Sequence, residues 1–203
     1  MTTIPINIAI EDDLSDAVIR RLLSECPKEY SVGATYGRSG FGYLRKTING
    51  WNRAAKGIPF ILLTDLDDAL CAPTLIHQWL NEPKSPNLLF RVAVQEVEAW
   101  LLADATNLSE YLKVPPSRFP SEPDSVTDPK GYLIELAKTS RSRELRQQIA
   151  PKPGTTAKQG PEYNPMLTAF VREHWDVSAS AETSPSLART RARLAEYTPV
   201  WST

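Results

Sequence analysis

The chain has 203 residues, of which 41% are hydrophobic and 23% are charged, and its formal net charge is −1. This composition matches ordinary globular proteins and excludes a collagen-like, coiled-coil or largely disordered chain. The length suits one main core with a helical appendage. A net charge near zero argues against a protein that coats nucleic acid by bulk electrostatics.

The amino-terminal residues lack the basic segment and apolar stretch of a secretory signal, and nowhere do about 18 apolar residues run together. We therefore expect a cytoplasmic protein with no membrane contact. Cys26 and Cys71 are far apart in sequence and have only His77 and His174 as other soft ligands. Free, buried thiols are the better interpretation, and a zinc site is not expected.

The first half of the chain alternates between strand and helix patterns. The apolar segment 4–10 predicts a strand, and a helix with Asp13 or Ser15 as its cap should follow. Segments 30–36 and 58–64 predict further strands, each followed by a helix, at about 43–55 and 73–80. A fourth strand over 87–94 leads into a helix over 96–104. Four such units in a row predict a Rossmann-like α/β domain with a mainly parallel sheet.

The second half carries no strand signals beyond residue 104. Helices are predicted over 129–139, 141–149, 164–175 and 186–197, separated by proline-rich segments and a polar loop over 151–165. We therefore divide the chain into an α/β domain over 1–105 and a mainly helical extension over 106–203 that packs on it.

Acidic residues follow three of the predicted strands, at the edge of a parallel sheet where ligands commonly bind. Glu11 follows the first strand, Asp65 and Asp67 follow the third, and Glu96 and Glu98 follow the fourth. Magnesium prefers oxygen ligands such as these, and a magnesium site can activate water and neutralise phosphate charge.

Some acids in these segments have a simpler explanation as helix caps, and we interpret Asp13, Asp16 and Asp68 in that way. Asp65 and Asp67 are different, because two like charges directly after an apolar strand repel each other unless a cation stabilises both.

Glu11 after the first strand and Asp65-Leu-Asp67 after the third resemble the signature of TOPRIM domains, which occur in topoisomerases, primases, recombination proteins and overcoming-lysogenization-defect nucleases. The segment 94–104 further resembles an uncharacterised TOPRIM-like family with a Glu-x-Glu-x-Trp-Leu-x-Ala-Asp helix. The similarity covers about residues 4–105, with weaker similarity at 128–130 and 160–163. One departure is Asp12, where many TOPRIM proteins have a glycine.

The resemblance implies a metal site for Mg²⁺ or Mn²⁺ that uses Glu11, Asp65 and Asp67. It also aligns Glu98 with the acidic position before the tryptophan, so we expect Glu98 as a fourth ligand and Glu96 as its reserve. Members of the similar family are often encoded beside ATPases in phage-defence regions, which implies an ATPase partner and a role in antiviral defence.

Basic residues are needed to contact phosphate oxygens. Arg38 and Arg45 lie around a glycine-rich turn at the same edge of the sheet, and Lys130 and Lys158 lie beside turn residues in the second half. We expect Lys130 and Lys158 to act with the acids as catalytic residues. Arg189 and Arg193 share one face of a predicted helix. They either contact the phosphates of one nucleic acid strand or form a solvated surface.

The leading hypothesis is a magnesium-dependent phosphodiester hydrolase, which is either a DNA or RNA endonuclease or the nuclease subunit of an ATPase-controlled phage-defence complex. The alternative is a noncatalytic TOPRIM-like scaffold that binds a partner. A response-regulator receiver fits less well, because the fourth strand is followed by glutamates rather than by the lysine that such a domain requires. Topoisomerase chemistry would need a nucleophilic tyrosine within a much larger protein.

Overall fold

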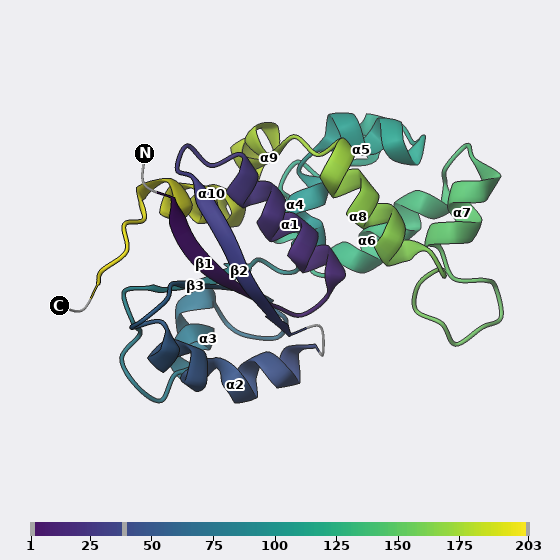
Figure 1. The fold of residues 1–203 in the computed structure, drawn as a ribbon. Helices are drawn as coiled ribbons and strands as arrows, with labels where there is room; N and C mark the ends of the chain where they lie inside the picture. The colour runs from purple at the N-terminus through teal and green to yellow at the C-terminus, as the bar shows by residue number, and fades with distance from the viewer. Residues whose placement is uncertain (1–2, 38–39, 202–203) are drawn as a thin grey trace.

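The computed structural model describes residues 3–37 and 40–201, and a four-stranded sheet forms its centre (Figure 1). All three strand pairings are parallel, and the strand order is β2-β1-β3-β4. This confirms the predicted α/β class and the parallel sheet. The strands are β1 (Ile4–Ile10), β2 (Tyr30–Gly37), β3 (Phe60–Asp65) and β4 (Leu88–Ala93).

The sheet has helices on both faces, as a parallel sheet requires. Figure 1 shows α2 and α3 on one face and α1 on the other, so β3 is buried on both sides. The first half of the chain contains α1 (Asp13–Ser24), α2 (Phe41–Ala54), α3 (Ala72–Trp79) and α4 (Val97–Leu102).

The second half is helical, as predicted, and several of its helices pack on the face that carries α1. Helix α8 lies beside α1, and α10 lies along β4 (Figure 1). Two short helices that the sequence pattern did not predict, α5 and α9, connect the longer ones. The elements are α5 (Ala105–Leu112), η1 (Pro116–Arg118), η2 (Pro123–Ser125), α6 (Pro129–Lys138), α7 (Arg143–Ile149), α8 (Tyr163–Glu173), α9 (Val177–Thr183) and α10 (Pro185–Glu196).

Each face of the sheet has its own hydrophobic core. The smaller core lies under α2 and α3 and includes Trp51 and Phe90. The larger core is continuous across both halves of the chain and includes Ile8 of β1, Trp100 of α4 and Phe170 of α8. The helical half therefore completes the core of the sheet rather than forming a separate core.

The structure corrects two local predictions. The N-cap of α1 is Asp12, whose carboxylate accepts a hydrogen bond from the Ser15 amide, rather than Asp13 or Ser15. Cys26 and Cys71 are free, as predicted, but each is only partly buried. The reason is their position, since Cys26 follows the end of α1 and Cys71 stands at the start of α3, where the chain approaches solvent.

Within residues 3–37 and 40–201, no helix is both long and apolar enough to cross a bilayer.

Candidate functional site

The carboxyl ends of β1 and β3 lie side by side, and this adjacency brings the first two acids together. Asp65 ends β3, and its amide donates a hydrogen bond of 3.2 Å to the carboxylate of Glu11. The hydroxyl of Thr64 donates to the same carboxylate oxygen. Burial raises the pKa of Glu11, while these two hydrogen bonds lower it.

Asp65 lies at the centre of the acidic group. One of its carboxylate oxygens accepts a hydrogen bond of 2.9 Å from the amide of Val97, the first residue of α4. Burial raises the pKa of Asp65 well above its ordinary value, and the charges of four other carboxylates raise it further. These carboxylates are Glu98, Glu11, Glu96 and Asp67. We call Asp65 and these four residues the acidic rim.

Asp67 differs from Asp65 in its surroundings. The buried residue Leu66 separates the two, and its amide donates to the carbonyls of Ala93 and Gln95. Asp67 then adopts a left-handed conformation with φ of 46°, which aspartate tolerates better than most residues, and it is exposed. Asp65 and Asp67, two residues apart in sequence, therefore occupy an inner and an outer position on the rim.

Glu98 is buried at the inner side of the rim, with 6% of its surface exposed. Its carboxylate accepts a hydrogen bond of 2.9 Å from the hydroxyl of Tyr163, at the start of α8. Burial and the charge of Glu96 raise the pKa of Glu98 from 4.5 to about 7, although Lys130 and Tyr163 lower it. Burial and the nearby Glu98 raise the pKa of the Tyr163 phenol, which therefore remains a donor.

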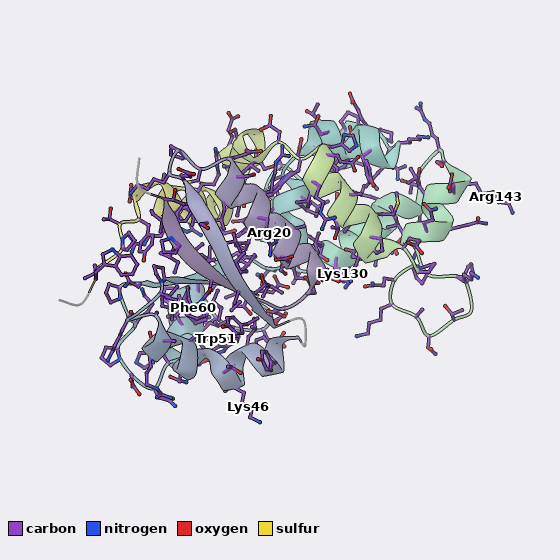
Figure 2. The ribbon with its side chains drawn as sticks, viewed as in Figure 1. Arg20, Lys46, Trp51, Phe60, Lys130 and Arg143 are labelled. Carbon is purple, nitrogen blue, oxygen red and sulfur yellow. The ribbon has the colours of Figure 1, made fainter. Side chains whose placement is uncertain are left out.

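Lys130 is the basic residue that the structure places against the rim. Its amide donates a hydrogen bond of 2.8 Å to the carboxylate of Glu96, and its ammonium lies 5.0 Å from the centre of the Tyr163 ring. Asp128 caps α6 and so fixes this start of the helix. Figure 2 shows Lys130 where the sheet meets the carboxyl-terminal helices. The charge of Lys130 lowers the pKa of both Glu96 and Glu98.

An open cleft of about 570 Å³ adjoins the outer side of the rim. Asp67 and Glu96 line it together with Arg45 and Asp128, and Phe41 and Trp79 supply its apolar wall. Such a cleft offers an extended ligand both a carboxylate edge and a cation, because Arg45 is exposed.

Lys158 is not brought to the rim. It is exposed on the loop between α7 and α8, which extends away from the body in Figure 1, and none of its described contacts is to the acids. Its catalytic role stays a prediction. Arg38 lies outside the described residues.

Two residues of the site were not recognised from the sequence as partners of the acids. Thr64 and Tyr163 donate to Glu11 and Glu98, and the similarity at 160–163 was the only signal for Tyr163. Asp104, at the end of the family-like segment, has a structural role. It is 2% exposed and accepts hydrogen bonds from the amides of Asn107 and Asp176.

The rim suits a divalent cation for two reasons. Hard cations prefer carboxylate oxygens, and the negative charge of the rim is unbalanced. Glu11, Asp65 and Glu98 would hold the ion on the inner side, with Asp67 on the outer side. Several of their oxygens already accept hydrogen bonds from the protein. In the described part of the chain, no three acidic, histidine or cysteine side chains are already arranged as a set of metal ligands. A bound cation would thus replace some of these protein donors.

Comparisons of the chain with protein families, with curated proteins and with solved structures find no significant match.

Proposed function

We propose that the protein is a phosphodiester hydrolase, a DNA or RNA endonuclease that uses Mg²⁺ or Mn²⁺ held by the acidic rim. The observation that carries this proposal is Asp65, a partly buried carboxylate with four other carboxylates around it. Like charges in a poorly solvated site raise one another's pKa, and a divalent cation relieves that repulsion. When bound, the metal supplies an activated water and neutralises phosphate charge.

The residues around the rim supply the remaining requirements of this chemistry. Lys130 is a cation close to Glu96 and Glu98, and it would offset charge on the phosphate as the water attacks. Thr64 and Tyr163 hold Glu11 and Glu98 in fixed positions through their hydrogen bonds. The cleft beside Asp67 and Arg45 gives a nucleic acid strand access to the outer side of the rim.

Cleavage of nucleic acid tests the proposal directly. Purified protein is incubated with plasmid DNA and with single-stranded RNA, in Mg²⁺, in Mn²⁺ and in chelator. We expect metal-dependent cleavage by the parent and at least a hundredfold loss in Asp65→Ala/Asp67→Ala, because removal of one key electrostatic group commonly costs about that much. The matched control is Glu110→Ala/Glu144→Ala, which removes two exposed acids from α5 and α7.

A second candidate function is a noncatalytic scaffold that binds a partner protein, and one observation favours it. Donors within the protein already occupy oxygens of Glu11, Asp65, Glu96 and Glu98, as expected of acids with a structural role. The proposed ATPase partner separates the two functions. Cleavage that appears only with an ATPase and metal supports a controlled nuclease of a defence complex, whereas binding without cleavage in either metal supports the scaffold.

A further inference from the structure

A group of four cations lies along the outer edge of the sheet, away from the acidic rim. Arg91 projects from β4, the edge strand, and its guanidinium donates to the hydroxyl of Thr190 on α10. Arg189 and Arg193 lie on either side of Thr190 in the same helix. Lys84 precedes β4, and its ammonium donates to the carbonyl of Leu88. We call these four residues the basic edge.

The charges of the basic edge repel one another. Burial, together with the charges of Arg189 and Arg193, lowers the pKa of Arg91 to about 10. Burial, Arg193 and Arg91 likewise lower the pKa of Lys84. Among the described residues none of the four cations forms an ion pair, although the protein pairs arginines elsewhere, as in Arg53 with Glu82. Arg91 and Arg193 are partly buried, Lys84 and Arg189 are exposed, and the four cations together lack an anion.

The direction of α10 connects this group to the rim. Ser186, in the first turn of α10, accepts a hydrogen bond from the amide of Val94 just beyond β4. At the other end, the hydroxyl of Tyr197 donates to Asn87, just before β4. The helix therefore runs antiparallel to β4 and starts beside the segment that carries Glu96. Arg189 and Arg193 follow within about two turns of that start.

We propose that Lys84, Arg91, Arg189 and Arg193 form a binding site for the phosphate backbone of a nucleic acid strand whose continuation reaches the acidic rim. Arg189 and Arg193 are four residues apart, or about 6 Å along the helix, so each guanidinium contacts a different phosphate. Guanidinium groups bind phosphate oxygens through paired hydrogen bonds. The identity of the anion as nucleic acid rests on the proposed function, whereas the lack of ion pairs among these four cations is independent of it.

Binding measured without metal tests this site separately from catalysis. Fluorescein-labelled single strands of DNA and of RNA are titrated with protein in chelator at several salt concentrations. We expect Arg189→Gln/Arg193→Gln to bind at least tenfold more weakly than the parent at moderate salt. The slope of log affinity against log salt should become less steep by about 1.4, or about 0.7 for each lost phosphate contact of a single strand.

The matched control is Arg141→Gln/Arg143→Gln, which removes the same charge from exposed positions. Arg143 lies at the opposite end of the molecule from α10 (Figure 2), so this variant should bind like the parent. Circular dichroism and thermal melts of each variant establish that loss of binding is not loss of fold.

Four outcomes would overturn the site. They are an absence of binding by the parent at low salt, unchanged binding by Arg189→Gln/Arg193→Gln, equal weakening by both arginine pairs, and equally tight binding of polyglutamate through the same arginines, which would indicate an acidic protein partner. Arginine-dependent binding without cleavage in any metal would support the site and contradict the proposed hydrolase. Metal-dependent cleavage with unchanged binding by Arg189→Gln/Arg193→Gln would do the reverse.

Discussion

Glu98 and Tyr163 show how one hydrogen bond joins the two halves of the chain at the acidic rim. The glutamate is on α4 and the tyrosine begins α8, yet both side chains are buried and only 2.9 Å separates their oxygens. A buried carboxylate without a donor is costly, so this contact contributes to folding and also fixes the position of Glu98.

Replacing Tyr163 with phenylalanine removes the donor to Glu98 and keeps the ring. We expect the free energy of unfolding to fall by about 1 to 3 kcal/mol, because the carboxylate is left without this partner. Urea denaturation measures the change. Tyr132→Phe is the control, since the Tyr132 hydroxyl bonds a carbonyl near the surface and its loss should cost much less. Equal losses of unfolding free energy in both variants would show that the Glu98 contact stabilises the protein no more than the surface contact of Tyr132.

The raised pKa of Glu98 predicts how stability depends on pH. A carboxyl whose pKa is about 7 when folded and near 4.5 when unfolded binds more protons in the folded state. Its contribution is therefore fully present below about pH 4.5 and is lost as pH rises to about 7.

Glu98→Gln should reduce this loss in metal-free protein, by about 1 to 3 kcal/mol across that range, because glutamine cannot ionise. Urea denaturation of both proteins at a series of pH values measures the difference. Parallel pH profiles would indicate that Glu98 ionises normally.

Among the helices and strands, those with a strong repeat of apolar residues were predicted from the sequence. Strand β3 is buried on both faces, and its apolar pattern predicted its place and its parallel, central character but not the order of the strands. Helix α9, with the sequence VSASAET, has no apolar repeat, and α5 is only eight residues long. Both begin at capping aspartates, Asp104 and Asp176, and Asp104 also accepts a hydrogen bond from the distant Asp176 amide, which depends on the tertiary fold.

Asp104→Ala should destabilise the protein by about 2 kcal/mol or more, since it removes the cap of α5 and the acceptor for the Asp176 amide. Thermal melts with and without Mn²⁺ measure this effect. The shift caused by Mn²⁺ should match that of the parent, because Asp104 is a cap and not a metal ligand. A smaller metal shift in the variant would place Asp104 in the metal site.

The positions of the site residues could be predicted only in part. Neighbouring parallel strands place Glu11 beside Asp65, and a sequence pattern is sufficient to expect this. The contact of Tyr163 with Glu98 spans 65 residues and depends on how α8 packs against α1. No local pattern carries that information. For the same reason, the different exposure of Asp65 and Asp67 follows from the buried Leu66 and not from their spacing.

For the whole molecule, the continuous core predicts that the α/β half does not fold alone. Trp100, Leu101 and Leu102 are fully buried, and the larger core that contains them includes residues of α8 and α10. A fragment of residues 1–105 would expose this surface to water. We expect it to lack a cooperative urea transition and the near-ultraviolet dichroism of the full chain. A fragment with a sharp transition would instead establish an independent domain.

Isothermal titration calorimetry with Mn²⁺ tests whether the acidic rim is a metal site. We expect saturable binding by the parent, loss of that binding in Asp65→Asn, and normal binding in Glu110→Gln, which removes an exposed acid on α5. Asparagine keeps the size of the side chain and removes the charge at the centre of the rim. A parent that binds no Mn²⁺, or an Asp65→Asn variant that binds it as tightly as the parent, would show that the rim is not a metal site.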